Sequence, residues 1–287
     1  MTVFQGIILG LLQGIAEFLP ISSSGHLKLA QRLFDLQEVP LLFDVMLHLA
    51  TLCSVVLFFR KKLWLLICSF CRIITFRKTD SYDETQLAAE KNNRHYILAI
   101  ITATVVTGII GVLTSKLLDD DLISIKVVCC GFIFTAFLLI FSSVIEKNIE
   151  KKRNVKSLND SGSFKAPSVF QSLLIGFAQG VGTLPGVSRS GSTIAGSLFC
   201  GVNRELAGEF SFIVSIPAIL GAFILELKDL GEVSQIVGIQ PLIGGIFAAF
   251  ASGYLALTWL TRLIKKGRLE WFALYLIPLG VLGLIFF

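Results

Sequence analysis

The first residues that could carry chemistry lie near the N-terminus, where polar side chains interrupt an apolar sequence. Gln13 and Glu17 are four residues apart, so they share one face of a helix. A serine-rich run, Ser22 to Gly25, follows Pro20 and leads directly to His26. A carboxylate in apolar surroundings is costly unless it has a partner or a task. A carboxylate base, hydroxyl nucleophiles and an imidazole that transfers protons near neutral pH together suit hydrolytic chemistry.

A second polar motif spans Pro185 to Thr193 and reads PGVSRSGST. Its small residues let the backbone approach a ligand closely, and the N–H groups at the start of the next helix favour an anion. Arg189 adds a planar pair of donors that suits phosphate oxygens. We therefore predict an oxyanion cradle, with Ser188, Ser190 and Thr193 binding substrate beside Arg189.

The two motifs belong to segments that resemble each other. A shift of 166 residues gives nine identities in the 24 ungapped positions that begin at Val3 and Val169. The same shift carries the apolar stretch Leu41 to Phe59 onto Phe210 to Leu227. The sequence therefore predicts an internal duplication, with repeat 1 at about 1–150, a linker at about 146–167 and repeat 2 at about 168–287.

Composition indicates the environment of these segments. The chain is 54% hydrophobic and only 16% charged, with a mean hydropathy of +0.79, whereas a soluble domain is about 25% charged. Apolar stretches of about 20 residues span a bilayer. We predict an all-α integral membrane protein, a single domain over 1–287, with six transmembrane helices. The predicted spans are Leu41–Phe59, Tyr96–Leu118, Ile123–Ile145, Phe210–Leu227, Ile236–Leu260 and Trp271–Phe287.

Three apolar segments do not fit as spans. Leu63–Phe76 is short and is placed at the membrane interface. Val3–Leu19 and Val169–Leu184 contain glycine and glutamine and are interpreted as two re-entrant helical hairpins. The net charge of +5 comes from short basic stretches between the spans, which indicates the positive-inside rule and no nucleic-acid partner.

The charge pattern also orients the two halves. The basic stretches, Arg60–Arg94, Glu146–Lys165 and Arg262–Arg268, are predicted to be cytoplasmic loops. The acidic stretches, Asp119–Asp121 and Glu226–Glu232, are predicted to lie outside. The two halves then have opposite orientation, and the first hairpin opens toward the periplasm. An inverted-topology repeat places a shared site near the bilayer midplane, where its two broken helices meet.

If the two loops meet, their residues suffice for phosphoryl transfer. Glu17 is the candidate base or ligand of a divalent cation, with Gln13 as a second oxygen ligand. A serine or an activated water would attack, and His26 would transfer a proton. A purely structural alternative pairs Arg189 with Glu17 or Glu209. His48 is interpreted as an ordinary core residue.

The two motifs together resemble the undecaprenyl-diphosphatase family, whose members are also called bacitracin-resistance proteins. The residues that carry the resemblance are Gln13, Glu17, Pro20, Ser22, Ser23, Gly25 and His26 in the first motif, and Pro185, Gly186, Ser188, Arg189, Ser190, Gly191 and Thr193 in the second. It extends through Gly201–Arg204 and Glu209–Phe212, and the hydropathy is similar from end to end.

The resemblance implies a multi-pass hydrolase of the bacterial inner membrane. It would convert undecaprenyl diphosphate to the monophosphate carrier of peptidoglycan synthesis, confer bacitracin resistance and depend on Mg²⁺ or Ca²⁺. It also implies that Glu17, Ser23, His26 and Arg189 are catalytic, and that Gln13, Ser22, Ser188, Ser190 and Thr193 contact the substrate. Many family members have glutamate at the Gln13 position, which weakens a two-carboxylate metal site here. A homodimer is a further expectation.

The competing interpretation is a transporter of a polyprenyl phosphate lipid. Inverted repeats with broken helices are typical of transporters, and a phosphate-binding loop would serve transport equally well. Glu17 and His26 beside a serine loop favour the hydrolase, because a carrier would not require them. The sequence leaves attack by Ser23 and attack by water as equal alternatives.

Overall fold

The structure is a computed structural model in which every described element is a helix. It describes residues 1–36, 39–76, 82–117, 124–156, 165–226, 237–266 and 268–287. Two predicted acidic stretches lie outside these residues. They are Asp119–Asp121 and all of Glu226–Glu232 except Glu226. Four helices form two pairs: α1 (Val3–Phe18) with α2 (Ser23–Leu33), and α7 (Val169–Val181) with α8 (Arg189–Phe199).

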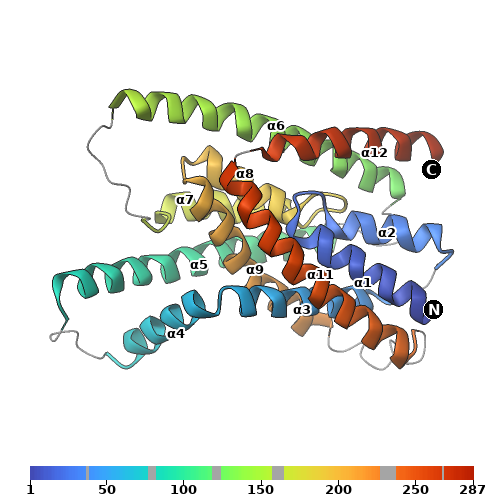
Figure 1. Cartoon of the computed structure of the whole chain (residues 1–287), viewed down its shortest axis with the longest axis horizontal. Helices are drawn as coiled ribbons and strands as arrows, with labels where there is room; N and C mark the ends of the chain where they lie inside the picture. The colour runs from blue at the N-terminus through green and yellow to red at the C-terminus, as the bar shows by residue number, and fades with distance from the viewer. Residues whose placement is uncertain (37–38, 77–81, 118–123, 157–164, 227–236, 267) are drawn as a thin grey trace.

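The remaining helices surround these two pairs (Figure 1). They are α3 (Leu41–Phe58), α4 (Arg60–Ile74), α5 (Glu84–Leu117), α6 (Ile125–Lys156), α9 (Arg204–Glu226), α11 (Ile239–Lys266) and α12 (Ala273–Phe286), the last preceded by a short 3₁₀ turn, η3 (Leu269–Phe272). Within the described ranges, five helices are long and apolar enough to cross a membrane, or six if the bent pair α3 and α4 forms one span. The prediction of an all-α, multi-pass membrane protein is confirmed.

All three predicted basic loops are wrong in their structure, although not in their charge. Arg60–Arg94 is largely helical, because α4 turns by 84° from α3 and α5 begins at Glu84. The stretch that begins at Glu146 continues α6 as far as Lys156. The third, Arg262–Arg268, is helical as far as Lys266, where α11 ends. Hydropathy marks where a helix leaves the apolar layer, and lysine, arginine and glutamate are themselves good helix formers. A loss of hydropathy therefore does not end these helices.

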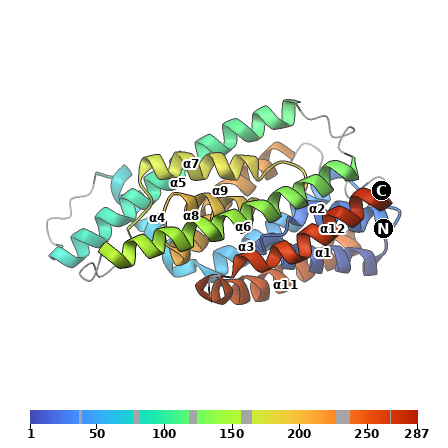
Figure 2. The same ribbon diagram turned by 90° about the horizontal axis from the view of Figure 1, so that it is seen from above.

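The two short helix pairs form hairpins that enter from opposite ends of the molecule. In Figures 1 and 2, α1 and α2 come from the end that holds the N-terminus, α7 and α8 come from the other end, and their connecting segments meet near the middle. Each hairpin starts with the same capping box: Thr2 with Gln5, and Ser168 with Gln171. The boxes are 166 residues apart, as the predicted repeat requires. The position of the hairpins in a bilayer stays a prediction.

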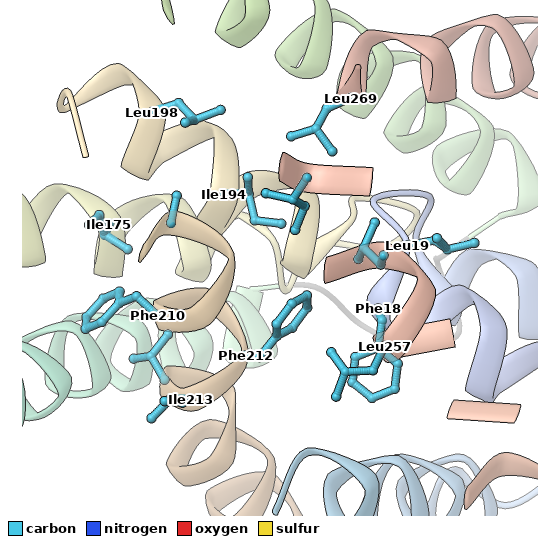
Figure 3. Packing of buried hydrophobic residues seen from close by; sticks show 14 of the residues in the cluster. Phe18, Leu19, Ile175, Ile194, Leu198, Phe210, Phe212, Ile213, Leu257 and Leu269 are labelled. Carbon is cyan, nitrogen blue, oxygen red and sulfur yellow. The ribbon is translucent and has the colours of Figure 1, made fainter. Parts of the chain in front are cut away.

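Each hairpin packs on a long helix from the other half of the chain. α1 lies along α11, and α7 lies along α5. Glycine allows this approach: a Cβ atom built on Gly10 would overlap the carbonyl oxygen of Gly245, and one on Gly176 would lie 2.6 Å from the carbonyl oxygen of Ala103. Figure 3 shows the apolar core around the hairpin tips, where Phe18 packs edge-on against Phe212 at a ring separation of 5.7 Å.

Gly10→Ala should destabilise the protein by about 1–3 kcal/mol, because the added methyl group forces α1 away from α11. The measurement is thermal unfolding of purified protein in detergent. Gly108→Ala on α5 is the matched control, because a Cβ atom there meets nothing within 4 Å. Equal melting temperatures for the two variants would contradict the close packing of α1 on α11.

Candidate active site

The site lies where the two hairpin tips meet. Glu17 is in the last turn of α1, and Arg189 is the first residue of α8. The Nη2 atom of Arg189 donates a hydrogen bond to Oε1 of Glu17, across 172 residues of sequence. The Ser190 hydroxyl donates to the Leu19 carbonyl oxygen at 3.2 Å. The structure thus brings together the two residues on which the predicted site depended.

The Glu17 carboxylate is buried and accepts hydrogen bonds from three sides. Its Oε2 atom accepts from the Ser23 hydroxyl at 2.6 Å and from Nε2 of Gln13 at 3.0 Å, while Oε1 accepts from Arg189. Only 5% of Glu17 is exposed, so this charge is offset almost entirely by its protein neighbours. A nucleophile and a base within hydrogen-bond distance form the arrangement that activates a hydroxyl group.

The Ser23 loop has an unusual backbone. Ser22 has a φ of +69°, a left-handed conformation that is uncommon for residues with a Cβ atom and that concentrates at functional sites. Its hydroxyl caps α2 by accepting from the N–H of Gly25 at 3.3 Å. Ser23 is therefore the first residue of α2, at the positive end of the helix dipole, which favours an anion near its hydroxyl.

His26 fixes this loop from the other side. Its Nδ1 atom lies 2.7 Å from the Ser22 carbonyl oxygen, and its Nε2 atom lies 2.8 Å from the Tyr275 hydroxyl. A carbonyl can only accept, so Nδ1 carries a proton, and a neutral ring then accepts from Tyr275 through Nε2. The described contacts of the ring nitrogens do not include Glu17 or Arg189. This geometry positions Ser22 and Ser23 directly, whereas the proton-transfer role of His26 stays a prediction.

Tyr275→Phe should lower kcat about fivefold with little change in KM, because one hydrogen bond to the His26 ring is lost while the stacked ring remains. Steady-state kinetics of phosphate release would measure this. Tyr254→Phe on α11 removes a hydroxyl from the same residue type elsewhere and should leave kcat unchanged. Equal rates for Tyr275→Phe and wild type would remove Tyr275 from the positioning of the loop.

The second hairpin supplies the predicted cradle. Ser188 caps α8 by accepting from the N–H of Gly191 at 3.0 Å, and its own N–H donates to the Thr135 hydroxyl at 3.0 Å. Its hydroxyl lies 3.3 Å from that of Ser190. The Thr193 hydroxyl donates to the Arg189 carbonyl oxygen at 2.7 Å, so its proton is used within the helix. Thr193 can offer a substrate only its oxygen lone pairs in this arrangement.

Several buried polar atoms at the meeting point have no hydrogen-bond partner among the described residues. They include Nη1 of Arg189, Oε1 of Gln13 and the hydroxyl of Ser192. Buried polar groups are normally paired, and an exception at a site needs an explanation. A phosphate oxygen would accept a hydrogen bond from the unused guanidinium N–H at the start of α8.

The comparisons with known proteins agree with this geometry. The family described as "Bacitracin resistance protein BacA" matches residues 6–282. The chain belongs to this family. Among curated members, the chain is 46% identical to the undecaprenyl-diphosphatase of Treponema denticola, over 98% of this chain and 96% of that protein.

Two more distant BacA relatives have the same printed name. The undecaprenyl-diphosphatase of Carboxydothermus hydrogenoformans is 37% identical over 99% of this chain and 97% of its own length. That of Methanobrevibacter smithii is 36% identical over 98% of this chain and 96% of its own length. The similarity therefore spans both hairpins and all the long helices.

The BacA resemblance also implies a divalent cation, and the residues at the hairpin tips permit only a partial protein site. No group of three or more His, Cys, Asp or Glu side chains lies close enough to hold a metal in the described parts of the chain. Glu17 and the unpartnered Oε1 of Gln13 are the oxygen ligands at hand. They fit a cation that is held mainly by substrate phosphate, because Mg²⁺ often binds through one or two protein oxygens plus phosphates.

Two residues of this BacA site were not predicted. His48 on α3, interpreted as an ordinary core residue, places Nε2 3.4 Å from Oε2 of Glu17, and its Nδ1 lies 2.7 Å from the Asp44 carbonyl oxygen. That interpretation is wrong, because His48 borders the carboxylate. Tyr275, the partner of His26, comes from α12. A histidine inside an apolar span was a usable signal for His48, whereas Tyr275 lies in no recognisable motif.

Proposed function

We propose that the chain hydrolyses undecaprenyl diphosphate to undecaprenyl phosphate and inorganic phosphate in a bacterial inner membrane. The observation that carries the proposal is the hydrogen bond of 2.6 Å from the Ser23 hydroxyl to Glu17, beside an Arg189 guanidinium with an unused N–H. Membership of a family whose curated relatives are named undecaprenyl-diphosphatase supports the substrate. The product would be the lipid carrier reused in peptidoglycan synthesis, which accords with the family's name for bacitracin resistance.

In the proposed reaction, Glu17 takes the proton of the Ser23 hydroxyl as its oxygen attacks the terminal phosphorus. The anhydride P–O bond breaks, and undecaprenyl phosphate leaves with the electron pair. Water then hydrolyses the phosphoserine and releases phosphate. Arg189 and the N–H groups at the start of α2 and α8 stabilise the charge that develops on the phosphoryl oxygens.

A bound Mg²⁺ or Ca²⁺ would neutralise part of the diphosphate charge. Gln13, through its Oε1 atom, and Glu17, through its carboxylate, are the residues proposed to hold the cation. Ser22, Ser188 and Ser190 are proposed to orient the phosphate oxygens through their hydroxyl groups. These roles follow from the positions of the groups around Glu17 and Arg189.

The test is phosphate release by the purified full chain in detergent. With undecaprenyl diphosphate and Mg²⁺ or Ca²⁺, we expect phosphate and undecaprenyl phosphate in equal amounts. Acid quenching during turnover of substrate labelled in its terminal phosphate should leave label on the peptide that contains Ser23. Turnover without labelled peptide would assign the attack to water, and absence of phosphate release would refute the hydrolase.

Transport of a polyprenyl phosphate lipid is the second candidate, because hairpins that meet from opposite ends also form transporter sites. Sealed vesicles that contain the protein would distinguish the two. Movement of lipid across the bilayer without phosphate release would favour transport. The predicted homodimer can be tested on the same preparation by its mass in detergent.

A further inference from the structure

A groove at the far end of α5 lies apart from the Glu17 site. It is bounded by the first turns of α5 and by the segment that leads into α7, and its volume is about 750 Å³. The two helices pack side by side (Figures 1 and 2). Lys91, His95 and Leu98 line one wall, and Lys165 and Val169 line the other. We call this feature the α5/α7 groove.

The second wall of the α5/α7 groove is fixed to the first. The side-chain oxygen of Asn92 accepts a hydrogen bond from the backbone N–H of Ala166 at 2.9 Å. Pro167 is buried, and Ser168 caps α7 in a reciprocal pair with Gln171. The segment between Lys165 and α7 is therefore held in place before any ligand binds.

The charge of the groove is unbalanced. Lys91, His95 and Lys165 are exposed, and no carboxylate is among the lining residues. Among the ion pairs between described residues, none joins Lys91 or Lys165 to an Asp or Glu side chain. The neighbouring Glu90 already pairs with Arg72 and Arg94, at 2.7 and 3.2 Å. Two ammonium groups with no carboxylate partner among the described residues, next to the positive end of α7, attract an anion.

The surface beyond these charges is apolar on both helices. Leu98, Ile101 and Val105 on α5 are exposed, and so are Phe170 and Leu173 on α7. Lys91 is two helical turns before Leu98, so charge and apolar surface follow one another within about 10 Å along α5. A soluble anion would use only the charges, whereas a membrane lipid would use both parts.

We propose that the α5/α7 groove binds the phosphate headgroup of an anionic phospholipid of the bilayer. Lys91 and Lys165 contact the phosphate, and the acyl chains lie along the exposed apolar side chains of α5 and α7. A basic cluster at the end of an apolar helix is the arrangement that recognises anionic headgroups at the membrane surface. The groove shares no residue with the Glu17 site, so this site is independent of the proposed hydrolysis.

Native mass spectrometry of the full chain in detergent tests the proposal. Phosphatidylglycerol and phosphatidylcholine with identical acyl chains are titrated separately, and the bound fractions give the two affinities. We expect phosphatidylglycerol to bind about tenfold more tightly or better, since each lysine contributes to the attraction. The double variant Lys91→Gln/Lys165→Gln should lose this preference.

The matched control is Lys116→Gln/Lys126→Gln, which removes two exposed lysines near the opposite end of α5 and α6. It should keep the preference, and all variants should release phosphate at the wild-type rate. Equal binding of the two phospholipids to wild type, or an unchanged preference in the Lys91/Lys165 variant, would overturn the proposal. Displacement of phosphatidylglycerol by undecaprenyl phosphate at equal concentration would also overturn it, by making the groove a substrate site.

Discussion

Glu17→Gln should lower kcat for phosphate release by about a thousandfold. Glutamine keeps the shape of the side chain but cannot take the proton of the Ser23 hydroxyl, which now lies 2.6 Å from the carboxylate. General-base catalysis contributes about 10²–10⁴-fold. The rate is measured with undecaprenyl diphosphate in detergent. Glu205→Gln is the matched control, because that carboxylate is half-exposed and pairs with Lys265 at 3.3 Å.

A structural role for Glu17 would give a different result, because loss of one partner leaves Arg189 buried without its counterion. Breaking a buried ion pair costs about 3–5 kcal/mol of stability. The double variant Glu17→Gln/Arg189→Gln removes both charges and should recover much of that stability. If the pair acts only in structure, activity should recover as well. We expect the double variant to melt near the wild-type temperature and to remain inactive.

The meeting of the Glu17 and Arg189 loops could be predicted from the sequence, because the internal repeat relates two segments that are far apart along the chain. Glu17 and Arg189 are 172 residues apart, and no local pattern links them. The shift that superimposes the two hairpin segments, combined with the predicted opposite orientation of the two halves, predicts that both loops lie at one depth. The capping boxes at Thr2 and Ser168 show that this similarity extends to local backbone structure.

The surroundings of that contact could not be predicted in the same way. His48 and Tyr275 reach the site because of the way α3 packs on α1 and α12 packs on α6, and no motif in the sequence shows which faces of these helices point toward the site. Hydropathy reports only that a segment is apolar. A motif likewise does not reveal that the Thr193 hydroxyl donates to the Arg189 carbonyl oxygen of its own helix and not to a ligand.

Arg189→Lys should lower kcat/KM about a hundredfold, although the positive charge is kept. In the structure, Nη2 of Arg189 is hydrogen-bonded to Glu17 while Nη1 is buried without a partner among the described residues. A guanidinium can hold the carboxylate and a phosphoryl oxygen at once, whereas an ammonium group is a single point of charge. Loss of one donor to a developing oxyanion costs about 10²–10³ in rate.

The division of this loss between kcat and KM decides what Arg189 contacts. If the free N–H group binds the phosphoryl oxygens mainly in the transition state, kcat falls and KM changes little. If it only attracts the diphosphate, the lysine variant keeps kcat and its KM rises. Arg204→Lys is the matched control, because Arg204 is also a partly buried arginine paired with a carboxylate, Glu146, but it lies on α9. Equal losses in the two variants would mean that Arg189 acts through the fold, and the phosphate contact would then have to come from the N–H groups of α2 and α8 alone.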